Sequence, residues 1–463
     1  MKKILPLLCC LCLIFNTSDA THLMGGEITA RQLTGFDYEI SIRLYRDTTG
    51  ISISSIQTFD IVNINTSFQQ SLTASHGGAN HLFHGVEMYE YLVNFTFPGN
   101  GTYRISWEQC CRNEAILNID SPSSKFLHLM TELTIGVSAN STPVFLNPPA
   151  VLAQKNSPWQ YNPLPFDADG DSLSWLLETP LNQGGVPVGG YTIPHADPLN
   201  PFTLNSLNGE ITWLPDSNGH WESSFRVEEF RGGIKIGEIR RDMQIIVVDD
   251  TSNYFRAAVN NGSWPQDGSG NFAMTIAPGV PFNFFVDAND SDLDMLSMDV
   301  MGEPLLITSN PASWLTSSST PGYVAGTFSW TPQLAQVRPQ PYLLAFRLFE
   351  HHSQYELTTD ETMMLFVSQS TSIPSEDESS GLSLFPNPAQ GSFNLSLQLK
   401  QSAEIQIDVR NILAKDCVVN YFGSFPAGRN VARVNTANLS PGSYLVTITI
   451  DGAQSYTKRL MIK

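Results

Sequence analysis

Acidic side chains at alternate positions are the first residues whose spacing suggests chemistry. Asp167, Asp169 and Asp171 surround a single glycine, which lets the backbone turn sharply while the three carboxylates converge. Calcium takes about six to eight oxygen ligands, so this loop supplies roughly half of a coordination shell. Asp249 and Asp250, at the junction of the two predicted repeats, are the further ligands that we expect from a neighbouring module. The sequence thus predicts a calcium site, with a solvated hydrophilic turn as the alternative.

A second acidic cluster recurs in matching surroundings. The segment Val286–Leu293 begins 120 residues after its counterpart Phe166–Leu173, and a Gly-x-x-x-Trp-x-Pro strand follows each of them. This shared register predicts a tandem repeat of one β-sandwich. For the second loop, calcium and a solvated turn both stay open. Its potential oxygen ligands are Asp287, Asn289, Asp290, Asp292 and Asp294.

The elements that must position these loops are strands. Short runs of alternating polar and apolar residues recur along the chain, dense turn signals separate them, and helical periodicity is nearly absent. Such a pattern predicts an all-β fold of sandwiches in series. Examples of these runs are Tyr38–Tyr45, Tyr103–Trp107, Met243–Val248 and Tyr444–Ile450.

The amino-terminal end and the charge indicate an exported protein. Two lysines, an apolar run and small residues up to Ala20 are typical of a cleavable signal peptide over residues 1–20. No later run is long and apolar enough to predict a transmembrane span. The chain has 25 basic and 44 acidic residues, a net charge of −19, which argues against nucleic acid and anionic lipid as partners. Calcium is plentiful outside cells and is therefore the ion that we expect.

Composition shifts and the repeat divide the chain into segments. Residues 369–381 are polar, acidic and poor in apolar side chains, as in a disordered linker. The predicted parts are a signal peptide (1–20), an N-terminal β domain (21–141), two sandwich repeats (142–250 and 251–368), the linker (369–381) and a small C-terminal β-sandwich (382–463).

The last segment carries several short motifs in a fixed order. They are Leu384–Ala389 with Gly391, the strand Ile405–Val409, Leu439–Val446 and the basic end Lys458–Lys463. In this order they resemble the C-terminal sorting domain of the type IX secretion system of Bacteroidetes. The resemblance implies that the secretion machinery is a partner and that the chain reaches the medium or the outer surface. The residues that match the sorting signal are Pro386, Asn387, Pro388, Gly391, Pro441, Gly442, Tyr444, Lys458 and Lys463.

The N-terminal segment resembles the opening module of large Bacteroidetes surface proteins. The matching stretches are Thr21–Ile28, Tyr38–Asp47 and Ile105–Asn113. Members of that group have a cysteine where this chain has Thr48, and this departure leaves Cys110 and Cys111 without an obvious partner. A vicinal disulfide, a pair of free thiols and an intermolecular bridge all stay open.

The two repeats resemble cadherin-like or immunoglobulin-like modules of bacterial adhesins, in which an acidic loop precedes a strand with the Gly-x-x-x-Trp-x-Pro pattern. The resemblance implies calcium-stiffened modules without enzymatic activity, and an unknown surface ligand, either a glycan or a protein. Common nucleophile, metalloprotease and phosphate-loop motifs are missing from the sequence. The alternatives are a secreted hydrolase or carbohydrate-binding accessory with its site in residues 21–141, and a gliding-associated structural protein.

Overall fold

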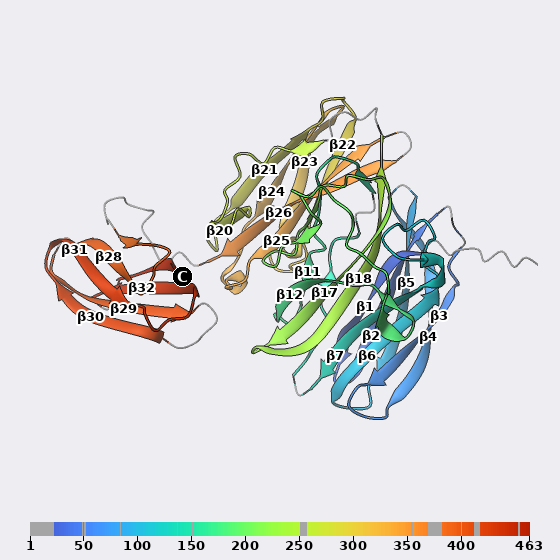
Figure 1. The fold of residues 1–463 in the computed structure, drawn as a ribbon, viewed down its shortest axis with the longest axis horizontal. Helices are drawn as coiled ribbons and strands as arrows, with labels where there is room; N and C mark the ends of the chain where they lie inside the picture. The colour runs from blue at the N-terminus through green and yellow to red at the C-terminus, as the bar shows by residue number, and fades with distance from the viewer. Residues whose placement is uncertain are drawn as a thin grey trace, which may run out of the picture. The chain divides into compact units, whose positions relative to one another are not determined.

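The structure is a computed structural model with two compact units, Met1–Gln369 and Ser370–Lys463. It describes residues 23–48, 50, 52–83, 85–136, 138–149, 152–250, 257–352, 355–368, 382–399, 401–411, 417–451 and 454–463. The predicted signal peptide and linker lie outside these residues. Strands make up nearly all of the regular structure, which confirms the predicted all-β class of tandem sandwiches (Figure 1). Among the described residues, no helix is long and apolar enough to cross a membrane.

Seven antiparallel strands enclose the first core, in the order β1-β2-β5-β4-β3-β6-β7. The alternation that predicted β2 places Ile40, Ile42 and Leu44 fully in that core. The elements are β1 (Leu23–Thr34), β2 (Asp37–Asp47), β3 (Ile56–Asn63), β4 (Gln69–Phe83), β5 (Val86–Thr96), β6 (Gly101–Cys110), the 3-10 helix η1 (Pro122–Ser124) and β7 (Phe126–Ile135).

The second module is built on the long hairpin of β17 and β18, and its core gathers around Trp159, Trp213 and Trp221. β12 pairs with β17, and β10, β16 and β15 form a short separate sheet. The elements are β8 (Val144–Phe145), β9 (Leu152–Gln154), β10 (Trp159–Tyr161), β11 (Pro165–Phe166), β12 (Ser172–Glu178), β13 (Leu181–Asn182), η2 (Gln183–Gly185), β14 (Val186–Pro187), β15 (Thr203–Leu204), β16 (Ile211–Trp213), β17 (Gly219–Arg231) and β18 (Ile234–Val248).

The outer edge of β18 joins the first two modules. Gly237 pairs with Leu133 of β7, Met243 pairs with Gly25 of β1, and the end of β18 pairs in parallel with β9. Without β18, β1 and β7 would be the edge strands of the seven-stranded sheet. Edge strands expose backbone N–H and C=O groups without hydrogen-bond partners. One hydrogen-bonded sheet therefore crosses the boundary that the sequence predicts between residues 141 and 142 (Figure 1).

The contact between β1 and β18 depends on a glycine. Gly25 has φ 129°, and a Cβ there would collide with the carbonyl oxygen of Asp242. We expect Gly25→Ala to lower the free energy of unfolding by about 2–3 kcal/mol, measured by urea denaturation, because neither backbone can give way without losing pairing. Gly77→Ala is the control, since a Cβ at Gly77 would meet nothing within 4 Å. Equal stability of the two variants would contradict this expectation.

The third module is a sandwich of two four-stranded sheets, β19-β21-β24-β23 and β20-β26-β25-β22. Their inner faces bury Trp264, Phe328 and Phe346 in one core. The elements are β19 (Ala258–Val259), β20 (Ala273–Ile276), β21 (Phe282–Asn289), β22 (Met295–Gly302), η3 (Glu303–Leu305), β23 (Ser313–Thr320), β24 (Tyr323–Trp330), η4 (Leu334–Gln336), β25 (Tyr342–His351) and β26 (Glu356–Val367).

The C-terminal unit is a small sandwich with its own core. The sheets β27-β28-β31 and β30-β29-β32-β33 bury Phe393, Ile405 and Ile448 between them. The strands are β27 (Ser383–Phe385), β28 (Ser392–Leu399), β29 (Ala403–Asn411), β30 (Cys417–Phe425), β31 (Gly428–Asn435), β32 (Gly442–Ile450) and β33 (Gln454–Ile462).

Candidate cation sites and the C-terminal domain

Strand register builds the first acidic cluster. β12 and β17 are paired so that Leu173 lies opposite Glu229, and the loop before β12 therefore ends beside Glu229. Carboxylate oxygens of Asp167, Asp171 and Glu229 lie within 4.8 Å of one another. We call these three residues the first cluster. Glu229 comes from the strand opposite the loop, and the sequence did not predict it as a ligand.

The first cluster contains buried oxygens that lack hydrogen bonds. Oδ1 of Asp167 accepts from the backbone N–H groups of Asp169 (3.0 Å) and Asp171 (2.9 Å). Within the described part of the chain, Oδ2 of Asp167 and both carboxylate oxygens of Glu229 are buried without a hydrogen-bond partner. Glu229 is 0% exposed. A buried carboxylate without a partner is costly, so it needs either a proton or a cation.

The electrostatics of the first cluster favour a positive charge. Burial raises the pKa of Glu229 to about 9, and the charges of Asp167 and Asp171 raise it further. Burial also raises the pKa of Asp167 to about 6, and Asp171 and Asp169 add to the effect. An ion of opposite charge would restore both groups to their ionised form, because it offsets the burial and the repulsion together.

Arg231 already supplies one positive charge at the edge of the first cluster. Its Nε and Nη2 donate to the two oxygens of Asp171 at 2.8 and 2.5 Å. The same guanidinium donates to Ser138 Oγ, the Ala139 carbonyl and Asn140 Oδ1, each at 2.8 Å. Arg231 therefore ties the loop to the segment after β7, but it leaves the buried oxygens of Glu229 without a partner among the described residues.

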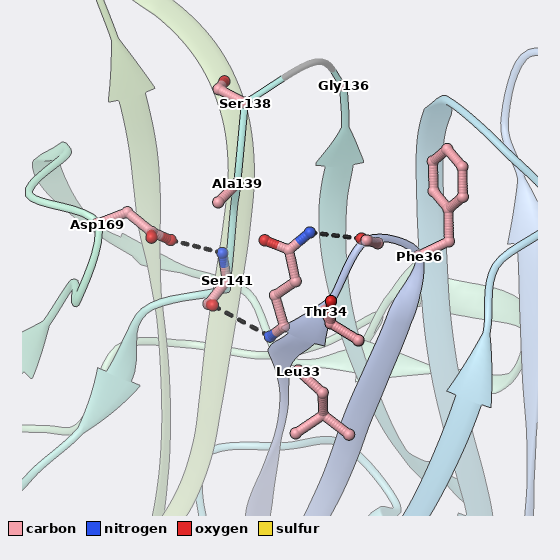
Figure 2. A pocket seen from close by; sticks show the side chains of 10 residues that line it. Leu33, Thr34, Phe36, Gly136, Ser138, Ala139, Ser141 and Asp169 are labelled. Atoms are coloured by element: carbon pink, nitrogen blue, oxygen red, sulfur yellow. Dashed lines mark hydrogen bonds between the residues drawn. The ribbon is translucent and has the colours of Figure 1, made fainter.

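Asp169 is not part of the first cluster and lines a cavity of about 560 Å³. Its Oδ2 accepts from the Ser141 N–H at 2.6 Å (Figure 2). Figure 2 shows Asp169 and Ser141 on one side and Phe36 on the other. Phe36 is 41% exposed. The cavity is thus a mixed polar and apolar hollow beside the first acidic loop.

Asp249 and Asp250 do not join the first cluster. Asp249 pairs with Lys155 Nζ at 2.8 Å, and Asp250 accepts a hydrogen bond from the Tyr355 hydroxyl. Burial raises the pKa of Asp294, and the charges of Asp292, Glu350 and Asp250 raise it further, so Asp250 lies near the second acidic loop instead.

In the second loop, the structure brings together three of the five predicted ligands. Oxygens of Asp290, Asp292 and Asp294 lie within 4.8 Å of one another, and Asp294 also belongs to a group with Glu350 and His352. Asp287 instead accepts from Asn260 Nδ2 at 2.7 Å, and Asn289 ends β21 with an exposed side chain. Neither Asp287 nor Asn289 is in these groups.

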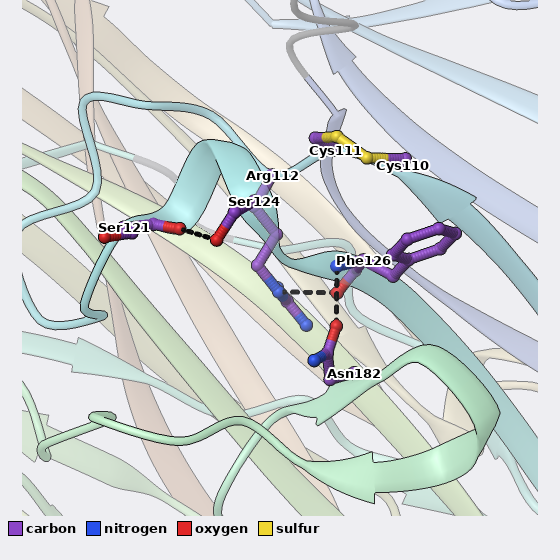
Figure 3. Close-up of a disulfide and its surroundings, with 7 residues drawn as sticks. All are labelled: Cys110, Cys111, Arg112, Ser121, Ser124, Phe126 and Asn182. Atoms are coloured by element: carbon purple, nitrogen blue, oxygen red, sulfur yellow. Dashed lines mark hydrogen bonds between the residues drawn. A yellow bond between two sulfur atoms is a disulfide. The ribbon is translucent and has the colours of Figure 1, made fainter.

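Cys110 and Cys111 form a vicinal disulfide in the structure, the first of the three predicted alternatives (Figure 3). Cys110 ends β6, and Cys111 follows it and precedes Arg112, whose guanidinium is buried. It donates to both oxygens of Asp242 at 2.9 and 2.7 Å and, through Nε, to the Phe126 carbonyl at 3.1 Å. The Cys-Cys-Arg motif thus delivers a buried cation to β18.

In the C-terminal unit, the Pro-Asn-Pro segment is fastened to the last strand. Asn387 Nδ2 donates to the Arg459 carbonyl, and Asn387 Oδ1 accepts from the Met461 N–H, both at 2.9 Å. Ala389 exchanges backbone hydrogen bonds with Met461 and Lys463. Lys458 and Lys463 are exposed. The two ends of the predicted sorting signal therefore form one surface.

A family model confirms the prediction of a C-terminal sorting domain. The model described as "Secretion system C-terminal sorting domain" matches residues 383–463. Residues 383–463 are a type IX secretion sorting domain. The sorting domain implies interaction with the type IX machinery, and it places the chain in the medium or on the outer cell surface.

The other comparisons add little to the sorting domain. No curated protein matched the chain. Among solved structures, the D00-D0 domain of intimin is 9% identical over 45% of this chain and 100% of that chain, with a TM-score of 0.20. Zebrafish RET cadherin-like domains 1 to 4 are 10% identical over 96% and 97%, with a TM-score of 0.17. Scores this low do not define a shared fold.

Proposed function

We propose that this secreted β-module protein is a non-enzymatic surface protein of the adhesin type in which calcium stiffens the first repeat. The observation that carries the proposal is the set of buried oxygens on Asp167 and Glu229, which have no hydrogen-bond partners among the described residues. In this proposal the sorting domain provides export, and the upstream modules hold a glycan or protein ligand.

The chemistry of the first cluster fits calcium among the common ions. All of its donors are carboxylate oxygens, and calcium accepts both monodentate and bidentate carboxylates in a flexible shell. Asp167 and Glu229 would hold the ion, Asp171 would share its charge between the ion and Arg231, and water would complete the shell.

A bound ion would connect parts of the chain that are far apart in sequence. Glu229 lies on the β17–β18 hairpin, Asp167 lies on the loop before β12, and Arg231 reaches the segment after β7. Because β18 also pairs with β1 and β7, holding the hairpin would restrain the junction of the first two modules. This is the sense in which calcium would stiffen the chain.

The raised pKa of Glu229 gives a pH test of the first cluster. The pKa of a glutamate in the unfolded chain is about 4.3, whereas burial raises the pKa of folded Glu229 to about 9, so the folded state binds more protons between these pH values. Stability in chelator should therefore fall as pH rises through this window. Calcium replaces the proton, so it should stabilise the chain more at pH 8 than at pH 5. Thermal melts measure both effects, and Glu229→Gln should flatten the pH dependence.

Binding assays test the adhesin part of the proposal. Purified chain is applied to glycan and matrix-protein arrays in calcium and in chelator, with an Asp167→Asn/Glu229→Gln variant alongside. We expect retention that is stronger in calcium and insensitive to calcium in the variant. Turnover of an arrayed polysaccharide or peptide would contradict a non-enzymatic role, and equal retention in calcium and chelator would contradict the role of the ion.

A further inference from the structure

The two repeats share a strand pattern in addition to their acidic loops. Phe225–Arg231 at the end of β17 and Phe346–His352, which runs one residue past the end of β25, have the same Phe-Arg-x-x-Glu order. Leu173 pairs with Glu229 in the first repeat, and Leu296 pairs with Glu350 in the second. Strand pairing therefore makes Leu173 equivalent to Leu296, an offset of 123 residues, which corrects the offset of 120 expected from the sequence. The equivalent positions are Asp171 and Asp294, Glu229 and Glu350, and Arg231 and His352.

The equivalent residues Arg231 and His352 differ in their ability to bind a metal ion. Arg231 fills its site with a guanidinium, which has no lone pair available for a metal. His352 places an imidazole at the same point, and a neutral imidazole nitrogen is a common metal ligand. The second repeat thus has a potential nitrogen donor where the first has a fixed cation.

The donor atoms of the second repeat converge around His352. Its Nε2 lies 2.8 Å from Glu350 Oε1 and 3.4 Å from Asp294 Oδ2. In a tetrahedral zinc site with bonds of about 2.0–2.2 Å, ligand atoms lie roughly 3.3–3.5 Å apart. Only a small adjustment of Glu350 would be needed to seat such an ion.

Asp290 supplies a further potential metal-binding oxygen beside these three donors. Oδ1 of Asp290 is buried and has no hydrogen-bond partner in the described residues, and Asp290 is 5% exposed. Its other oxygen accepts from the Asp294 N–H at 2.8 Å, which holds the loop against Asp294. Asp290 is therefore placed to complete the shell or to bind its water.

Outer contacts orient the donors. The Ala257 N–H donates to Glu350 Oε2 at 2.8 Å, which leaves Oε1 directed at His352. The His352 ring stacks on Tyr355 with centroids 4.6 Å apart, and the Tyr355 hydroxyl donates to Asp250. Such outer partners fix ring orientation in metal sites. The Asp294 side chain is 29% exposed, which provides a path for entry.

We infer that Asp294, Glu350 and His352 form a binding site for a borderline divalent metal ion of the zinc class in the second repeat. A nitrogen ligand with two carboxylates suits zinc, whereas calcium prefers oxygen donors alone. The two repeats then differ in ion selectivity through one residue. This site does not depend on calcium binding by the first cluster.

Zinc titration of the full chain by calorimetry, in metal-free buffer at pH 7.5, tests the inference. We expect saturable binding of one zinc ion per chain that persists in millimolar calcium. His352→Arg recreates the side chain of the first repeat and should weaken zinc binding at least about tenfold, since it removes a ligand and adds a charge. His351→Asn, on the same strand end, should leave zinc binding unchanged.

Three results would overturn the inference: no zinc binding, zinc binding that His352→Arg does not weaken, or displacement of zinc by an equal concentration of calcium. Circular dichroism checks that each variant is folded. If His352→Arg is not folded, His352→Gln serves in its place, with the same expected loss.

Discussion

Replacing Arg241 by alanine is expected to lower the free energy of unfolding of the larger unit by about 3–5 kcal/mol. Arg241 and Glu27 are both buried, and the guanidinium donates to the two carboxylate oxygens at 3.0 and 2.9 Å. It also donates to the Asn147 carbonyl at 2.6 Å and lies 4.3 Å from the centroid of the Phe145 ring. Truncation would leave the charge of Glu27 buried without its counter-ion.

Urea unfolding followed by tryptophan fluorescence measures this loss. Arg31→Ala is the matched control, because its side chain is 64% exposed and pairs with Glu39 at 2.8 Å. An exposed pair contributes less than about 1 kcal/mol. Similar losses in the two variants would show that the β1–β18 junction does not depend on the buried pair.

Replacing Arg347 by alanine is the second change with a large expected effect, also about 3–5 kcal/mol. Arg347 is buried and donates to both oxygens of Asp360 at 2.7 and 3.0 Å. Asp360 also accepts from Asn147 Nδ2 at 2.7 Å and from the Asn162 N–H at 3.0 Å. Arg347 itself donates to the Pro148 carbonyl at 3.0 Å. One buried pair thus fastens the second repeat to the first.

The Arg347→Ala variant should lose stability and also become sensitive to proteases between the repeats. Denaturation gives the first quantity, and mass spectrometry of limited digests locates the second. Arg338→Ala is the control, since Arg338 pairs with Glu303 inside the second repeat at 2.5 Å. The role of Arg347 at the junction would be contradicted if both variants were cut between the repeats at the same rate.

Local pattern was sufficient to predict the strands and the sorting domain. The alternating runs Tyr38–Tyr45 and Met243–Val248 correspond to parts of β2 and β18. In β2 burial follows the alternation along most of the run, as in a strand with one buried face. In β18 the polar Gln244 is buried as well, so the alternation identified the strand but not its exposed face. The sorting motifs are contiguous and ordered, so they were recognisable without knowledge of strand pairing.

The candidate sites were only half predictable, because register between distant strands cannot be inferred from either strand alone. The acidic loops are local features, whereas Glu229, Glu350 and His352 reach them through pairing with β12 and β22. The sequence nevertheless contained a pattern that could have identified Glu229 and Glu350, since the Phe-Arg-x-x-Glu order recurs at Phe225 and Phe346.

The sequence did not predict the burial of three arginines, for a different reason. Arg112, Arg241 and Arg347 sit in strands or turns where a charged residue ordinarily marks the solvent side, yet each is at most 2% exposed. The acidic partners of Arg112 and Arg241 lie far away in the sequence. Asp360, the partner of Arg347, faces it from the next strand, and only the strand register brings the two together.

The most direct test of the account is a calorimetric calcium titration of the full chain, with Glu229→Gln and the neighbouring Glu228→Gln as a matched pair. Glu228 pairs with Lys235 at 2.7 Å and lies outside the first cluster. We predict saturable binding with a Kd of about 0.1–1 mM that is lost in Glu229→Gln and retained in Glu228→Gln. Calcium at a hundredfold Kd should stabilise the chain by about 2.7 kcal/mol. The account would be contradicted if calcium did not bind at a concentration of several millimolar, or if the two variants bound it equally.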